Sequence, residues 1–152
     1  MLRLRAQIDG HVDKHPGLSA DKELLESIPG IGPMAALWIM AELPHPKQFG
    51  SAQAAAAYAG LAPQERRSGT SIKGRTRLSK AGKRQLRRAL YMPAVSARRW
   101  NPLVRDLYDR LIERGHCKMA AIGACMRKLL MLAYGVLKNR CKFDATISTA
   151  TS

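Results

Sequence analysis

Apolar residues recur every three or four positions along most of this chain, and the strict alternation typical of a half-buried β-strand hardly occurs. The sequence therefore predicts an all-α fold. The first expected helix covers residues 2–12, with Leu2, Leu4 and Ile8 as its apolar anchors. It is predicted to end before Pro16.

Proline, glycine and serine divide the next part of the chain into three short helices. Ser19 is expected to cap the first of these, and Pro29 to stop it. The second, strongly apolar helix is expected over residues 34–43, with Pro33 at its first position. The third is alanine-rich and is expected over residues 51–59.

The helical pattern is lost from residue 62 to residue 78, which predicts an exposed loop or a loose hairpin. Ser79 is then expected to cap a helix that Pro93 kinks. In that helix the basic residues fall on one side, and the apolar residues fall on the opposite one: Leu86, Ala89, Leu90 and Ala97.

Two further helices complete the expected core. Asn101 and Pro102 open the first, and Gly115 follows it. The second, over residues 118–138, is expected to be the central rod of the core, and the tail over residues 144–152 is expected to fray. One apolar face runs the length of the rod: Met119, Ile122, Gly123, Met126, Leu129, Leu130, Ala133 and Leu137.

Charge changes the picture, because the chain carries 26 Lys and Arg against 11 Asp and Glu, a net charge of +15. The segment from residue 64 to residue 99 holds twelve of those cations and a single acid, Glu65, so it carries +11 of the total. Solvated protein surfaces normally mix the two signs. With 46% apolar residues, the composition indicates a folded domain whose partner is a nucleic-acid backbone.

The sequence disfavours a membrane protein, a cysteine motif and a metal site. No continuous apolar run approaches the ~18 residues that cross a bilayer, so the sequence predicts a cytoplasmic protein without a membrane partner. Cys117, Cys125 and Cys141 are odd in number and show no C-x-x-C spacing, which predicts three buried or partly buried thiols. His11 and His15 are one helical turn apart, but no third ligand is close, so a metal site is disfavoured.

The segment LLESIPGIGPMAA, residues 24–36, has the form of a helix-hairpin-helix motif. Gly30 and Gly32 allow the turn backbone to approach a phosphate, and the N–H groups at the start of the second helix can donate to it. Such contacts hold DNA without reading its sequence. A plain turn between two helices is the alternative interpretation.

Ser68 and Gly69 follow Arg66 and Arg67 in the basic segment. A serine hydroxyl there can attack a phosphodiester if cations neutralise the phosphate oxygens and a base removes the proton. Taken alone, the pair is more typical of a turn than of a catalytic site.

Four segments occur in a fixed order: LLESIPGIG, AYAGLAP, RRSGTSIKGRTRLSKAGKRQLRRALYMPA and MRKLLMLAYGVLKN. Together they resemble the C-terminal transposase domain of the Piv-related insertion-sequence recombinases, the family of the one-ten, one-sixteen and nine-oh-two elements. The resemblance covers residues 24–143, most of the chain.

The resemblance implies a DNA recombinase that cuts and rejoins strands through a phosphoserine link. It places the nucleophile at Ser68 and disfavours its neighbours Ser71 and Ser79. Members of this family carry four metal-binding acids in an N-terminal RuvC-like domain. No cofactor is therefore expected in this chain, and a divalent metal such as Mg²⁺ is expected only with that domain. The scattered acids of this sequence agree, because a two-metal site needs clustered carboxylates.

The expected organisation has three parts. Residues 1–18 are interpreted as the stub of a linker helix, 19–143 as the transposase domain and 144–152 as a flexible tail. Within the domain, 19–44 form the helix-hairpin-helix, 62–78 the basic serine loop and 79–141 the helical core. Because the RuvC-like part is not in this sequence, the isolated chain is expected to be inactive. The alternative is a non-catalytic nucleic-acid-binding module from a truncated transposase.

DNA is the expected partner, with a structured guide RNA and a homo-oligomer on DNA implied by the family, in the nucleoid of a prokaryotic cytoplasm. The residues expected to hold nucleic acid come from the hairpin, the loop and the following helix: Gly30, Gly32, Arg66, Arg67, Lys73, Arg75, Arg77, Lys80, Lys83, Arg84, Arg87 and Arg88.

Overall fold

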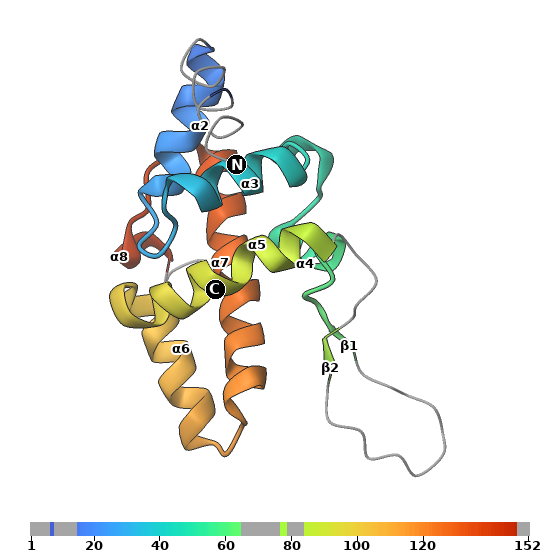
Figure 1. The fold of residues 1–152 in the computed structure, drawn as a ribbon, viewed down its shortest axis with the longest axis vertical. Helices are drawn as coiled ribbons and strands as arrows, with labels where there is room; N and C mark the ends of the chain where they lie inside the picture. The colour runs from blue at the N-terminus through green and yellow to red at the C-terminus, as the bar shows by residue number, and fades with distance from the viewer. Residues whose placement is uncertain (1–6, 8–14, 65–76, 79–83, 149–152) are drawn as a thin grey trace.

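The computed structural model describes residues 7, 15–64, 77–78 and 84–148, and it confirms the all-α class (Figure 1). The predicted helix over residues 2–12 lies outside the described residues except for Gln7. The elements are α2 (Pro16–Glu26), α3 (Pro33–Glu42), the 3₁₀ turn η1 (Pro46–Gln48), α4 (Ala52–Tyr58), β1 (Pro63–Gln64), β2 (Arg77–Leu78), α5 (Arg84–Trp100), α6 (Pro102–Glu113), α7 (Lys118–Asn139) and α8 (Ala145–Ser148).

Helix α7 is the centre of the core, as predicted. It packs against α2, α4, α5, α6 and η1, and in Figure 1 α5 crosses it near its middle. Its buried face includes Ile122, Met126, Leu129 and Leu130. Met119 is the exception, because it lies in the first turn, beyond the packed helices, and is 66% exposed. Its predicted place in the core is wrong.

Most helix starts follow the residues that the sequence marks. Pro33 begins α3, and the side chains of Ser51 and Asn101 cap α4 and α6. The prediction that Ser19 caps helix α2 is wrong. Helix α2 begins at Pro16, and its N-cap is His15, four residues before Ser19. The fixed φ of Pro16 suits a first helical position, and Ser19 N donates to the His15 carbonyl within that turn.

Helix α5 runs unbroken through Pro93 for 17 residues. Its buried face is the predicted one, with Leu86, Leu90 and Ala97 fully buried and Ala89 half-buried. Ser79, the expected cap, lies outside the described residues.

Within the described part of the C-terminal tail, residues 145–148 form the short helix α8; the expected fraying stays a prediction. The Asp144 carboxylate accepts hydrogen bonds from the Thr146 N–H (2.9 Å) and hydroxyl (2.6 Å). This local capping pattern orders the turn.

The prediction for the cysteines holds for one of three. Cys125 is buried in the core, whereas Cys117 and Cys141 are exposed. Cys117 is exposed because it is the N-cap of α7. Cys141 follows Arg140, where the chain leaves α7 in a left-handed turn.

Among the described helices, α7 is the one long and apolar enough to cross a membrane by length and composition. Its apolar side chains pack against five other elements, which is the arrangement of a core helix.

Candidate nucleic-acid interface

Helices α2 and α3 are joined by a turn over residues 27–32, which we call the hairpin turn. Its assignment as a helix-hairpin-helix motif stays a prediction. Ile28 and Ile31 of the turn are buried, and Ile31 N donates to the Ile28 carbonyl at 3.0 Å. The turn therefore has its own apolar anchors, which hold it against the rest of the domain.

Gly30 is in the left-handed region, with φ +106°. A Cβ built on Gly30 would lie 2.5 Å from the Cβ of Ala97 in α5. Real atoms essentially never approach so closely, so only glycine fits here. Gly30 thus lets the hairpin turn pack against α5, a role that the sequence did not reveal. Its contact with a phosphate stays a prediction.

Gly32 lies in a different environment. It is exposed, and among the described residues nothing lies within 4 Å of a Cβ built on it. It is the N-cap of α3 with extended backbone, φ −89° and ψ −178°. The N–H groups of the first turn of a helix have no helical carbonyl partner. The start of α3 can therefore receive a phosphate oxygen.

Asn101 is the buried polar residue that joins the hairpin to the α5–α6 corner. Its Nδ2 donates to the Pro29 carbonyl at 3.2 Å, while its Oδ1 accepts from Leu103 N at 3.1 Å. The side chain thus caps α6 and holds the hairpin turn at the same time. Together with the contact between Gly30 and Ala97, it holds the hairpin turn against the buried side of α5.

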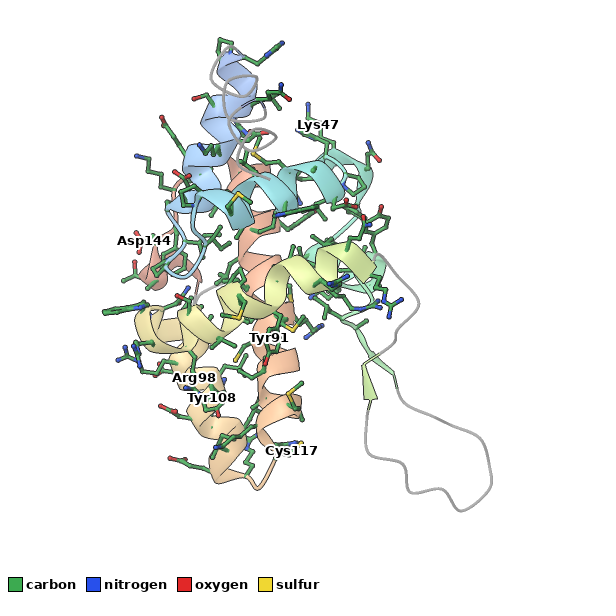
Figure 2. The ribbon with its side chains drawn as sticks, viewed as in Figure 1. Lys47, Tyr91, Arg98, Tyr108, Cys117 and Asp144 are labelled. Carbon is green, nitrogen blue, oxygen red and sulfur yellow. The ribbon has the colours of Figure 1, made fainter. Side chains whose placement is uncertain are left out.

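Helix α5 exposes a continuous row of side chains at helical spacing, which we call the α5 stripe: Arg84, Arg88, Tyr91, Met92 and Arg99. Its sequence contains no acidic residue, so the three arginines project positive charge over the whole length of the helix. Tyr91, on the front of α5 in Figure 2, and Met92, which is 65% exposed, place apolar surface between the arginines. This combination is typical of surfaces that contact nucleic acids.

Two arginines of α5 are turned toward the protein. Arg87 is half-buried, and its Nη1 donates to the Ala59 carbonyl at the end of α4, at 3.4 Å. The guanidinium of Arg98 lies 4.7 Å from the centre of the Tyr108 ring, a cation–π contact with α6 (Figure 2). Arg87 was predicted to hold nucleic acid beside Arg84 and Arg88, and the structure gives it a role in helix packing as well.

The base of the basic segment is described, and the segment itself is not. β1 and β2 pair antiparallel, with Pro63 opposite Leu78 and Gln64 opposite Arg77. The β1–β2 pair thus brings positions 64 and 77 together, between α4 and α5 in the chain. The remaining predicted site residues lie outside the described part of the chain: Arg66, Arg67, Ser68, Lys73, Arg75, Lys80 and Lys83.

Within the part of the chain that the structure describes, no three His, Cys, Asp or Glu side chains gather where they could hold a metal ion. His15 is exposed at the start of α2, and His11 lies outside the described residues.

Comparison with known proteins assigns the chain to a family. The profile of the "Transposase IS116/IS110/IS902 family" matches residues 22–109, more than half of the chain. The pilin gene-inverting protein of Moraxella bovis is 37% identical over 134 residues, 87% of this chain and 41% of that protein. The uncharacterized 43.6 kDa protein of insertion element IS110 from Streptomyces coelicolor is 34% identical over 136 residues, 90% of this chain and 32% of that protein.

A third relative, the uncharacterized 42 kDa protein of insertion element IS900 from Mycobacterium paratuberculosis, is 31% identical over 131 residues, 86% of this chain and 33% of that protein. The chain thus spans between 32% and 41% of the length of these relatives. The profile match runs from the second half of α2 through α3, α4 and α5 to most of α6. By this match and these identities, the chain belongs to the IS116/IS110/IS902 transposase family.

Proposed function

We propose that this chain is the strand-joining domain of a DNA transposase. The start of α3 and the α5 stripe hold the DNA backbone, and Ser68 acts as the nucleophile. Arg66 and Arg67 neutralise the phosphate under attack. Lys73, Arg75, Arg77, Lys80 and Lys83 hold the flanking backbone.

One observation carries the DNA-binding half of the proposal. The hairpin turn is locked onto α5 by the close packing of Gly30 and Ala97 and by the hydrogen bond from Asn101 to Pro29. The open N-terminus of α3 and the acid-free α5 stripe therefore keep a fixed relation to each other. The donors at the start of α3 and the exposed arginines along α5 each suit the repeating charge of a nucleic-acid backbone.

The chemical step uses the serine hydroxyl. The Ser68 Oγ attacks a phosphorus atom of the backbone, a P–O bond to the sugar breaks, and the sugar oxygen leaves with a proton. The product is a phosphoserine link that conserves the energy of the phosphodiester. A hydroxyl of a second DNA end then attacks the same phosphorus, restores a phosphodiester and releases Ser68 with its proton.

In this proposal the acids for a divalent metal would come from the RuvC-like domain of the family, and Mg²⁺ held there would supply charge neutralisation. The described residues of this chain hold no such cluster. A structured guide RNA and assembly as a homo-oligomer on DNA, in the prokaryotic cytoplasm, belong to the same proposal.

The test is Ser68→Ala, with Ser71→Ala as the matched control in the same segment. Each variant is combined with the RuvC-like domain of a relative, in one polypeptide or in trans, and incubated with end-labelled DNA of the parent element and Mg²⁺. We expect a covalent protein–DNA product with wild type and with Ser71→Ala, and none with Ser68→Ala. DNA affinity should be equal in all three. A covalent product that survives in Ser68→Ala would overturn the assignment of the nucleophile.

A purely binding module is the second candidate, and the acid-free charge of α5 favours it as much as it favours the first. The same assay separates the two. Tight, salt-sensitive DNA binding without a covalent product in any protein would support the binding module.

A further inference from the structure

A second basic site lies away from the α5 stripe, at the C-terminal end of α7. There, the start of α2, the turn η1 and the end of α7 enclose a pocket of about 640 Å³. Lys47 comes from η1, and Lys138 and Arg140 come from the end of α7. We call this the α7-end pocket.

The charges around this pocket do not balance. Lys47, Lys138 and Arg140 are permanent cations, whereas Asp21 is the one carboxylate among the described lining residues. Asp21 forms an ion pair with Arg140. The pocket therefore keeps an excess of two positive charges from Lys47 and Lys138, before any contribution from His45.

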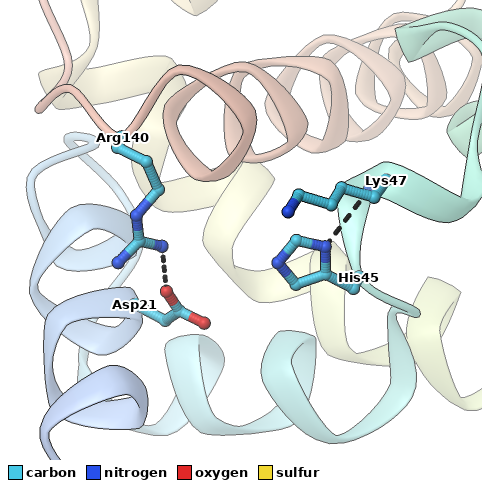
Figure 3. Close-up of polar contacts among 4 residues, drawn as sticks. All are labelled: Asp21, His45, Lys47 and Arg140. Carbon is cyan, nitrogen blue, oxygen red and sulfur yellow. Dashed lines mark hydrogen bonds and ion pairs between the residues drawn. The ribbon is translucent and has the colours of Figure 1, made fainter.

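The side chains point toward a common space (Figure 3). Arg140 and Asp21 meet on one side of it, and the Lys47 side chain extends toward it from η1. The backbone N–H of Lys47 donates to Nδ1 of His45 at 3.2 Å. Because Nδ1 accepts this bond, the neutral imidazole carries its proton on Nε2, which is then a further donor.

The backbone at Arg140 supports this arrangement. Arg140 ends α7 in the left-handed region with φ 55°, a conformation that non-glycine residues seldom adopt. The turn lets its guanidinium reach Asp21 of α2, 119 residues away. A left-handed residue at this position is a common way for an α-helix to end.

Compensation of the α7 dipole accounts for part of the charge. Cations near a helix C-terminus are stabilised by about 0.3–1 kcal/mol, which suits Lys138 and Arg140. Lys47 belongs to a separate turn, η1, and adds a third cation at the same end of α7. Apolar Pro46 and Leu137 also line the pocket, and apolar walls strengthen the attraction of these cations for an anion.

We propose that the α7-end pocket binds a backbone phosphate of a nucleic acid, as a second contact beyond the α5 stripe. Lys47 and Lys138 neutralise the phosphate oxygens, and His45 Nε2 donates to one of them. The identification of the anion as a nucleic-acid phosphate rests on the proposed function. The chemistry is the same for DNA and RNA, so the experiment distinguishes the two sources.

The test variant is Lys47→Ala/Lys138→Ala in the full chain. The matched control is Arg114→Ala/Lys118→Ala, which removes the same charge from exposed positions at the opposite end of α7. Binding of a duplex DNA and of a single-stranded RNA is measured over a salt series. Loss of one phosphate contact lowers the slope of log K against log [salt] by ~0.9 for DNA and ~0.7 for a single strand. We expect this drop in the test variant and a smaller change in the control.

A drop on DNA alone assigns the pocket to DNA, and a drop on RNA alone assigns it to RNA. Equal salt slopes for the test and control variants on both probes overturn the proposal for the α7-end pocket. In that case, loss of binding in Arg84→Ala/Arg88→Ala still supports the proposed function, because those arginines belong to the α5 stripe. If the wild-type chain binds neither probe, the proposed function fails. A titration with inorganic phosphate then tests whether the α7-end pocket binds an anion. The titration is followed by the amide NMR signals of His45, Lys47 and residues 138–140. Shifts that the test variant abolishes support an anion site there, and unshifted signals exclude one.

Discussion

The Asn101 side-chain amide donates a 3.2 Å hydrogen bond to the carbonyl of Pro29, 72 residues earlier in the chain. The same side chain caps α6 through the N–H groups of Leu103 and Val104. One buried asparagine thus joins the turn of the hairpin to the start of another helix. Loss of it affects both the stability of the domain and the position of the hairpin.

We expect Asn101→Ala to lower the free energy of unfolding by about 2–4 kcal/mol. Loss of an N-cap costs roughly 1 kcal/mol, and a buried carbonyl left without its partner costs about 1–3 kcal/mol. Urea unfolding measures the change. Ser51→Ala, which removes the cap of α4 alone, is the control and should cost about 1 kcal/mol. Equal losses in the two variants would show that the bond to Pro29 contributes nothing.

Substitution by alanine should lower the free energy of unfolding much more at Gly30 than at Gly32. Gly30→Ala forces a Cβ to within 2.5 Å of Ala97 at positive φ. Positive φ costs about 1–2 kcal/mol, and overpacking costs about 1–3 kcal/mol more. Gly32→Ala meets open space among the described residues, so it should cost only the N-cap preference for glycine over alanine, about 0.5–1 kcal/mol. Chemical denaturation of both variants checks this, and a strongly destabilised Gly32→Ala would contradict it.

Measurements of DNA binding and of stability should distinguish the exposed arginines of α5 from Arg87. Arg84 and Arg88 are exposed, so replacing either by alanine should reduce the log–log salt slope of DNA binding by ~0.9 and leave stability nearly unchanged. Arg87 donates to the Ala59 carbonyl, so Arg87→Ala should instead lower the unfolding free energy by about 1 kcal/mol. Fluorescence anisotropy over a salt series and urea unfolding give the two readouts. The division fails if Arg84→Ala is the destabilised variant.

The thiols should differ in reactivity. Cys117 and Cys141 are exposed, whereas Cys125 is buried, and burial raises the pKa of the Cys125 thiol from 9.0 to about 11, an effect only partly offset by Arg98. At pH 8, a thiol reagent should modify two cysteines rapidly and the third only after unfolding. Rapid modification of all three in the native protein would contradict the buried position.

The same pKa shift predicts a dependence of stability on pH. The unfolded thiol loses its proton near pH 9, while the folded one keeps it until about pH 11. The contribution of the protonated Cys125 thiol to the free energy of unfolding is therefore complete below pH 9. It is lost as the pH rises to 11, by about 1.4 kcal/mol per pH unit. Between pH 9 and pH 11, the free energy of unfolding of the wild-type chain should fall more steeply with pH than that of Cys125→Ser, in which no thiol titrates at this position. Parallel curves would refute the effect.

Local signals in the sequence were enough for the helical frame. Pro33, Ser51 and Asn101 mark helix starts because their preferences act within a few residues, and the five-turn apolar face of α7 predicted its central place. The failures have equally local causes. Ser19 is a good cap residue, but Pro16 already provides a helix start. Met119 continues the apolar pattern beyond the last helix that could cover it.

The candidate site was less predictable. The glycines of the hairpin were expected to face a phosphate, yet Gly30 packs against Ala97, 67 positions along the chain, and no pattern of adjacent residues encodes that contact. The bond from Asn101 to Pro29 is similarly long-range. The positive charge of α5 was visible in the composition, because charge is a property of the residues themselves. Which arginine faces outward depends on neighbours such as the end of α4.

The pairing of Gln64 with Arg77 has a consequence for engineering this chain. The ladder of β1 and β2 brings the two ends of the intervening sequence together at one place in the described structure. Loop-closure entropy grows only slowly with the number of residues between two fixed ends. A change in the number of residues between positions 64 and 77 should therefore cost the described helices little free energy of unfolding.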